Sequence, residues 1–202
     1  MKNGWSIKRI GEVCDLATGG TPSRKKPEYF GGKIKWLVSG DIHQGEIYEC
    51  NGRITELGVK NSNAKMLTPN SVLIALNGQG KTKGTVAILR TEATCNQSLV
   101  AIYPKPGVDL LPEFIYLNLQ GRYEEIRRLT SDGDNDRKGL NMSIIKNIKI
   151  PLAPLPAQEK IIENIKQAFL KISIAKEISE KRIELLDKLK RSVLQEAYSF
   201  RS

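Results

Sequence analysis

The sequence predicts an α+β fold, in which a β-rich domain over residues 1–155 is followed by one long C-terminal α-helix over residues 156–202. The helix is predicted by residues 157–199, which contain no glycine and no proline and repeat apolar residues at alternating spacings of three and four. That period is typical of a helix that buries one seam against another helix. The domain is predicted by short runs of β-branched residues between glycine-rich loops. A proline-rich stretch, residues 150–156, separates the two patterns.

Turn residues divide the first part of the domain into short elements. Residues 5–16 alternate loosely and fit a strand, a short helix or both, and the composition of residues 18–23 predicts a turn. The further elements expected here are a strand over residues 34–38, a weaker strand over 53–55 and a short helix over 56–65.

The second part of the domain contains the clearest strand patterns. Aliphatic and β-branched residues fill 71–76 and 85–89, and the glycine-rich loop 77–84 between them predicts a hairpin or two neighbouring strands. The further elements expected here are a strand over residues 99–103, a helix over 113–129 that begins after Pro112, and a polar loop over 130–141.

Length and charge limit the possible classes of protein. The 202 residues can form one sizeable core, or a core with an appendage. The net charge of +10 favours an anionic partner, most often nucleic acid, although a merely basic soluble protein has the same balance. No apolar run approaches the ~18 residues that a membrane span needs, and the first residues contain no apolar signal region. We therefore expect a cytoplasmic protein with no membrane partner.

The cysteines and the single histidine do not follow the spacing of a metal site. Cys14, Cys50 and Cys95 are far apart, and together with His43 they show none of the paired spacings of zinc ligands. We therefore expect buried, reduced thiols and no bound metal.

One glycine-rich segment imitates a phosphate-binding loop. Residues 75–82 consist of an alanine, four further residues and then Gly-Lys-Thr. In a nucleotide-binding loop a helix must follow, so that its N-terminal N–H groups meet phosphate, but residues 85–89 have the composition of a strand. A nucleotide hydrolase that uses Lys81 and Thr82 is therefore disfavoured. The favoured hypothesis is a flexible loop that exposes Lys81 and Lys83 to a phosphate backbone.

Two further patterns give little support to calcium binding or catalysis. Residues 132–136 begin like a calcium loop, but Arg137 and Ser143 stand where glycine and glutamate are required. A serine hydrolase needs a histidine with partners, and His43 has no evident partner in the sequence.

Several short motifs follow one another along the chain. They occupy residues 4–5, 19–23, 34–37, 40–42, 80–88, 95–99, 139–141, 148–161 and 189–198. Together they resemble the specificity (S) subunit of type I restriction–modification systems, in a half-length form with one target-recognition domain. The resemblance covers nearly the whole chain, and its most specific element is the proline-rich segment that enters the long helix.

The resemblance implies a DNA target-recognition domain over residues 1–155 and a spacer and dimerisation helix over residues 156–202. Members of this family usually carry two such halves, each reading one part of a split DNA target, with the two spacer helices packed antiparallel. A non-catalytic subunit of this kind directs a DNA adenine methyltransferase (M) and a restriction (R) subunit to double-stranded DNA. No cofactor is expected on this chain, since S-adenosylmethionine and ATP belong to the partner subunits. A natural half subunit, a truncated gene and a fragment all remain open.

The seam of the long helix predicts self-association. An exposed apolar stripe of this length is not stable alone in water, and a helix that spans about 63 Å, at about 1.5 Å per residue, exceeds what this domain needs to cover itself. We therefore expect a homodimer through antiparallel helices, which would read an interrupted palindrome. The expected interface residues are Ile161, Ile165, Ala168, Ile172, Ala175, Ile178, Leu186, Leu189 and Val193.

Loops of the domain are expected to contact DNA. The expected phosphate contacts are Arg24, Lys25, Lys26, Lys81, Lys83 and Lys138. The expected base readers are Gln79, Asn135 and Arg137, because arginine suits guanine and asparagine or glutamine suits adenine. The motif residues expected to shape loops and core are Gly19, Gly20, Thr21, Pro22, Asn96 and Gln97.

Two other functions stay open as hypotheses. One is a stand-alone nucleotide-binding enzyme that uses the loop of Gly80, Lys81 and Thr82. The other is a helical adaptor that assembles proteins through its seam and does not bind DNA.

Overall fold

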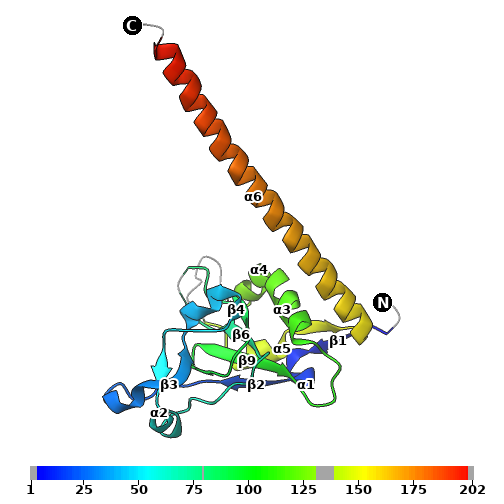
Figure 1. Cartoon of the computed structure of the whole chain (residues 1–202). Coiled ribbons are helices and arrows are strands. Elements are labelled where there is room, and N and C mark those ends of the chain that lie inside the picture. The colour runs from blue at the N-terminus through cyan, green and yellow to red at the C-terminus, as the bar shows by residue number, and fades with distance from the viewer. Residues whose placement is uncertain (1–3, 79, 131–138, 200–202) are drawn as a thin grey trace. The chain divides into compact units, whose positions relative to one another are not determined.

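The computed structural model describes residues 4–199 except Gln79 and residues 131–138, and it confirms an α+β fold with a β-rich part and one long C-terminal helix (Figure 1). The chain divides into two compact units, Met1–Glu159 and Lys160–Ser202, here called the globular unit and the helical unit. Helix α6, Leu155–Ser199, forms the helical unit and gives its first residues to the globular unit. None of the described helices is long and apolar enough to cross a membrane.

The described strands of the globular unit form three sheets. The described strands are β1 Ser6–Arg9, β2 Cys14–Thr18, β3 Phe30–Leu37, β4 Glu46–Ile47, β5 Arg53–Ile54, β6 Val72–Ala75, β7 Val86–Leu89, β8 Thr94–Cys95, β9 Leu99–Pro104 and β10 Lys149–Leu152. The largest sheet has the order β2-β9-β6-β7-β4, a smaller one has the order β5-β3-β8, and β1 pairs with β10. The predicted hairpin is confirmed, because β6 and β7 pair antiparallel with Val72 opposite Ile88.

Short helices connect and cover these strands. The described ones are α1 Ile10–Val13, η1 Pro27–Tyr29, η2 Ser39–Gln44, α2 Glu56–Lys60, α3 Pro112–Gly121, α4 Tyr123–Arg128 and α5 Met142–Asn147. The single helix expected over residues 113–129 is wrong in its extent, because the chain breaks at Arg122 into α3 and α4. Gly121 favours this break, since glycine is a weak residue for a helix interior. The guanidinium of Arg122 also donates to the carbonyl oxygen of Lys149, which ties the break to β10.

The core lies around the middle of the largest sheet. Every residue of β6 and β7 is buried, which is typical of strands covered on both faces. Helix α3 packs against both strands, and Leu73, Ala87 and Ala101 belong to the same buried cluster. The continuous aliphatic runs of the sequence therefore mark the centre of the sheet.

The Gly19-Gly20 motif shapes this core. The backbone N–H of Gly20 donates to the carbonyl oxygen of Cys95 at 2.9 Å. A Cβ atom at Gly19 would lie 1.8 Å from that same oxygen, so no larger residue fits there. The hydroxyl of Thr21 donates to Oε1 of Gln97 at 2.6 Å, which joins the motif to the turn between β8 and β9. The motif fixes the backbone, as the sequence predicts.

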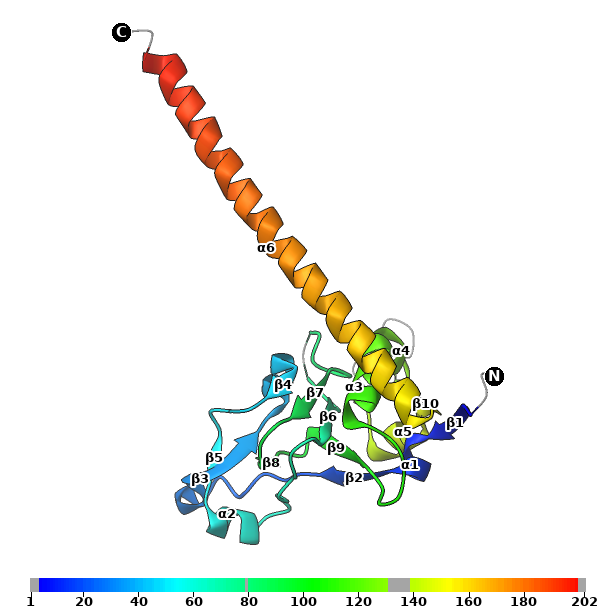
Figure 2. The ribbon, with the colours of Figure 1, turned by 45° about the vertical axis from the view of Figure 1, so that its right-hand side comes forward.

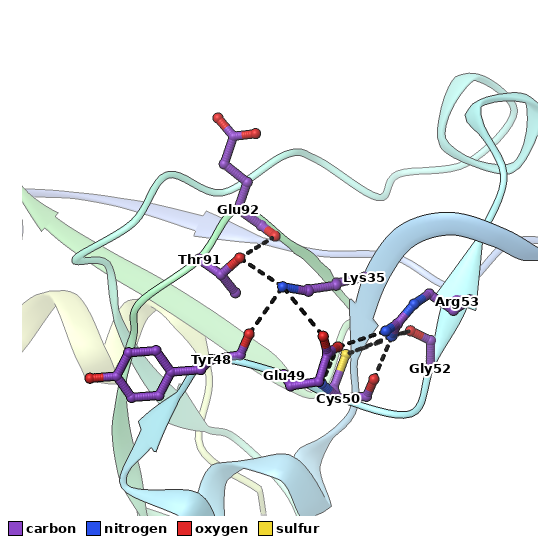
Figure 3. Close-up of polar contacts among 8 residues, drawn as sticks. All are labelled: Lys35, Tyr48, Glu49, Cys50, Gly52, Arg53, Thr91 and Glu92. Atoms are coloured by element: carbon purple, nitrogen blue, oxygen red, sulfur yellow. Dashed lines mark hydrogen bonds and ion pairs between the residues drawn. The ribbon is translucent and has the colours of Figure 1, made fainter.

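A polar cluster joins β3 to the connection between β4 and β5 (Figure 3). Nζ of Lys35 donates to the carbonyl oxygen of Tyr48 at 3.0 Å and to Oγ1 of Thr91 at 2.9 Å. It also lies 3.6 Å from Oε2 of Glu49, and the other oxygen of this carboxylate accepts from Nη2 of Arg53 at 2.6 Å. Because Lys35 and Arg53 both bond to protein groups, this cluster links β3 to the connection between β4 and β5.

The start of α6 is anchored by Gln158, whose side chain is 0% exposed. Its Oε1 accepts from the backbone N–H of Leu111 at 2.9 Å, and its Nε2 donates to the carbonyl oxygens of Asp109 and Ala153 at 2.8 and 2.7 Å. A buried amide without these partners would cost about 1–3 kcal/mol. The proline-rich stretch therefore leads into a helical turn that belongs to the globular unit.

Candidate nucleic-acid interface

The loop between β6 and β7 is a tightly bonded turn. The backbone N–H of Gly84 donates to the carbonyl oxygen of Ala75 at 2.9 Å, and Oγ1 of Thr85 donates to the carbonyl oxygen of Lys81 at 2.6 Å. Gly80 and Gly84 have φ angles of 59° and 84°, in the region that favours glycine. Strand β7 follows the loop, so the helix that a phosphate-binding loop requires is not there.

Helix α4 holds this loop from one side. Oη of Tyr123 donates to the carbonyl oxygen of Lys81 at 2.9 Å. Nη1 of Arg127 donates to the carbonyl oxygen of Gly80 at 2.6 Å and to Oη of Tyr123 at 2.8 Å. The sequence analysis did not select Tyr123 or Arg127, because bonds to main-chain atoms of a distant loop leave no motif.

A small cavity opens beside the loop. It measures about 280 Å³ and is lined by His43, Lys81, Gly84, Thr85, Val86, Gln120 and Tyr123. His43 reaches the loop from η2, where its Nε2 lies 3.0 Å from Oγ1 of Thr82. The cavity wall thus combines a lysine, a histidine, an amide and an aromatic ring, which are side chains that suit phosphate and base contacts.

The two lysines predicted to be exposed in this loop differ. Lys81 is exposed, but Lys83 is 3% exposed and its Nζ donates to Oγ1 of Thr130 at 3.1 Å. The expected exposure is therefore wrong for Lys83, because its ammonium is bonded to Thr130, and a buried ammonium requires such a partner. Lys81 is the described lysine of this loop whose side chain faces solvent.

The described residues on either side of 131–138 are bonded to the same loop. The bond from Lys83 holds the residue before the segment, and just after it the backbone N–H of Leu140 donates to the carbonyl oxygen of Leu76 at 2.9 Å. The predicted contacts that lie outside the described residues are Gln79, Asn135, Arg137 and Lys138.

The basic cluster of Arg24, Lys25 and Lys26 lies elsewhere. All three residues are exposed and precede η1, which packs against β3 and α2. Helices α2 and α4 lie at opposite ends of the globular unit in both views (Figures 1 and 2). Lys33 and Lys60, which the sequence analysis did not select, line a cavity of about 520 Å³ near α2. Among the described residues, the exposed cluster 24–26 and the exposed Lys81 therefore form two separate groups of predicted phosphate contacts.

The described residues offer little to catalysis. They contain no group of three His, Cys, Asp or Glu side chains that could hold a metal ion. Cys14, Cys50 and Cys95 are buried free thiols, as expected. Burial raises the pKa of Cys14 and of Cys95 to about 12. Thiols in such surroundings are poor nucleophiles.

The predicted seam lies on α6. The members of the seam are Ile161, Ile165, Ala168, Ile172, Ala175, Ile178, Leu186, Leu189 and Val193, and those from Ala168 onward are exposed. Leu186, for example, is 64% exposed. An exposed stripe of large apolar side chains marks an interaction surface.

Two comparisons relate most of the sequence to known proteins. A family model described as type I restriction modification DNA specificity domain matches residues 2–184. The type I restriction enzyme MjaIX specificity subunit of Methanocaldococcus jannaschii is 29% identical over 188 residues, which are 92% of this chain and 41% of that protein. The EcoR124I/EcoR124II specificity subunit of Escherichia coli is 27% identical over 158 residues, which are 77% of this chain and 39% of that protein.

Solved structures share the fold. One, described as showing complex assembly and conformational transition of the type I R-M system, has a TM-score of 0.73 and 20% identity over 96% of this chain and 46% of that chain. The HsdS subunit from Thermoanaerobacter tengcongensis has a TM-score of 0.64 and 21% identity over 86% of this chain and 39% of that one. The chain thus spans less than half the length of each of these relatives.

Proposed function

Because the chain belongs to the type I restriction modification DNA specificity domain family, we propose that it is a non-catalytic subunit that recognises one half of a bipartite DNA target. It directs a DNA adenine methyltransferase (M) and a restriction (R) subunit to that target. S-adenosylmethionine and ATP bind to those partners, not to this chain. The observation that carries the proposal is the family match over residues 2–184, which includes the globular unit and most of α6.

Double-stranded DNA meets the globular unit at the loop between β6 and β7 in this proposal. Lys81 is exposed on a turn that its own bonds and α4 hold in shape, and the net charge of +10 attracts a polyanion. Thr130 and Leu140, the described residues before and after 131–138, are bonded to Lys83 and Leu76 at the two ends of this loop.

The basic cluster of residues 24–26 supplies a second group of phosphate contacts. Its position near α2 separates it from the loop near α4, so the two groups meet different stretches of the DNA backbone. Phosphate contacts of this kind position a protein on the duplex without reading sequence. We expect the two groups to contribute independently to affinity.

Self-association through α6 supplies the second recognition domain. The exposed seam needs an apolar cover, and a second copy of this chain offers the same seam. Two such helices packed antiparallel would place two identical domains about a two-fold axis. The resulting target is an interrupted palindrome.

Methylome sequencing tests the recognition role. Cells that express this chain together with its methyltransferase subunit should gain adenine methylation at one interrupted site, and cells that express the methyltransferase subunit alone should not. Lys81→Met should weaken DNA binding and reduce the slope of log affinity against log salt by about 0.9, because one phosphate contact is lost. If no site is methylated while the chain still binds the methyltransferase subunit, an assembly adaptor becomes the better account.

Mass in solution tests the dimer. The chain should have twice its mass of 22.5 kDa, and Leu186→Glu combined with Leu189→Glu should return it to a monomer. Lys181→Glu, on the charged outer face of α6, is the matched control and should remain a dimer. A wild-type monomer at the same concentration would refute self-association by the chain alone.

A further inference from the structure

The seam of α6 is interrupted near its middle by two polar residues. Between Ala175 and Leu186, the positions that continue the alternating spacing of four and three are filled by Ser179 and Arg182. Both residues are exposed, and they lie on a helix that continues without a break in both views (Figures 1 and 2). Any helix that covers the whole seam must therefore cover a serine and an arginine as well.

The serine and the arginine have complementary hydrogen-bonding capacity. Oγ of Ser179 donates to the carbonyl oxygen of Ala175 at 2.8 Å, so its lone pairs remain able to accept. Within the part of the chain that the structure describes, the guanidinium of Arg182 makes no hydrogen bond or ion pair. A guanidinium enclosed between two helices requires an acceptor. The Ser179 oxygen of a facing helix can supply one.

One antiparallel alignment of two copies of α6 places Ser179 of each copy opposite Arg182 of the other. The remaining layers of the seam follow by counting outward from this pair. They are Ala175 with Leu186, Ile172 with Leu189, and Ala168 with Val193. Each alanine then meets a larger aliphatic residue, so the layers have similar volumes, as close packing of an interface requires.

Other alignments place Arg182 against unsuitable side chains. A slip of the two copies by one heptad puts it opposite Ile172 in one direction and Leu186 in the other, where no side-chain acceptor faces it. A parallel pair puts Arg182 opposite Arg182 and Ala175 opposite Ala175, which combines like charges with a packing gap. In the antiparallel alignment the two arginines instead occupy successive layers, about 4.5 Å apart along the helix axis.

We propose that Ser179 and Arg182 form a polar layer that fixes the direction and the register of an α6 pair, whose partner is a second copy of this chain. This inference rests on the proposed self-association and gives it one alignment. A polar residue at a single seam position specifies register in this way at some cost in stability. The register matters for DNA recognition, because a slip of one heptad would move the two copies by about 10.5 Å, the length of about three base pairs.

Disulfide cross-linking of the full chain measures this register. Ala168→Cys combined with Val193→Cys reports the proposed alignment, and Ala168→Cys combined with Leu186→Cys reports the alignment that is slipped by one heptad. The native thiols are buried, so the wild-type chain treated in the same way gives the background. Each variant is oxidised under native conditions, and mass spectrometry of the linked peptides identifies which cysteines have joined.

We expect the pair at positions 168 and 193 to give at least about tenfold more linked dimer than the pair at positions 168 and 186, because a slip leaves Arg182 without an acceptor. Adding Arg182→Leu should keep the chain dimeric and bring the two yields within about twofold, since purely aliphatic layers no longer select one register. Arg191→Leu makes the same change at an exposed position outside the seam. This matched control should keep the wild-type ratio of yields.

The mass of each variant in solution before oxidation separates the possible failures. A dimer that links the slipped pair as readily as the proposed pair would overturn the inference, and so would a dimer that links neither pair. A ratio of yields that Arg182→Leu leaves unchanged would also overturn it, because another feature would then set the register. A wild-type chain that stays monomeric would instead refute the self-association on which the inference rests.

Discussion

Leu73 in β6 and Leu186 in α6 carry the same side chain in opposite environments, 0% and 64% exposed. Leu73 lies in the sheet that the globular unit closes around itself, among residues such as Ala87 and Ala101. Leu186 lies on a helix whose seam the described chain leaves open. The globular unit buries its own hydrophobic core. The helical unit instead exposes apolar side chains, and burying them stabilises the protein only when another helix covers them.

The largest expected difference between the two units is in thiol reactivity. Cys95 is 0% exposed and has a pKa of about 12, so its thiolate at neutral pH is roughly a thousandfold rarer than that of a free cysteine. A cysteine placed on α6 by Ser173→Cys should be alkylated rapidly, because Ser173 is exposed. Mass spectrometry of the folded protein should count one label per chain. Labelling of the native cysteines at the same rate would show that the core opens freely.

Stability should respond to the two leucines differently. Leu73→Ala should lower the free energy of unfolding of the globular unit by about 2–5 kcal/mol, because it leaves a cavity in the core. Leu186→Ala should change that quantity by less than about 0.5 kcal/mol, as expected of an exposed site. Trp5 and Trp36 both lie in the globular unit, so tryptophan fluorescence during urea unfolding reports this unit alone. An equal fall in the free energy of unfolding in the two variants would contradict the division into units.

The smallest effect is expected from Glu49, in the polar cluster that joins β3 to the connection between β4 and β5. The backbone N–H of Cys50 and then the guanidinium of Arg53 lower the pKa of the Glu49 carboxyl below its usual value of 4.5. The ionised form therefore stabilises the folded state above that value, and the contribution is lost as the pH falls through the lowered pKa. Glu49→Gln should make the urea midpoint fall less on acidification. The change should be small, because this side chain is 63% exposed. If the urea midpoint of the wild type and of Glu49→Gln changed equally with pH, the Glu49 carboxylate would not stabilise the folded state in this way.

The sequence pattern predicted the elements whose formation depends on neighbouring residues, such as the hairpin and α6. The hairpin of β6 and β7 follows from two aliphatic runs around a glycine-rich loop, and α6 follows from a long periodic segment without glycine or proline. The break at Arg122 was missed, because the bond from its guanidinium to the carbonyl oxygen of Lys149 is a tertiary contact.

The candidate site was less predictable for the same reason. Lys83 resembles Lys81 in the sequence, but a hydroxyl 47 positions later receives its bond and the side chain is buried. Tyr123 and Arg127 hold the loop through its carbonyl oxygens, which every residue has, so no side-chain motif revealed them. Gly80, by contrast, was evident from the loop composition, and its φ of 59° gives the reason.

The antiparallel pairing of β1 with β10 has a consequence for how such proteins can evolve. Ser6 lies opposite Leu152, so the first strand of the globular unit closes against the strand that leads out of it. The chain therefore enters and leaves the sheets of this unit side by side, and Gln158 at the start of α6 completes its packing. A domain whose ends lie close together can be duplicated or exchanged between genes without changing the order of its strands. Under the proposed function, such exchange would change the recognised DNA target in one recombination step.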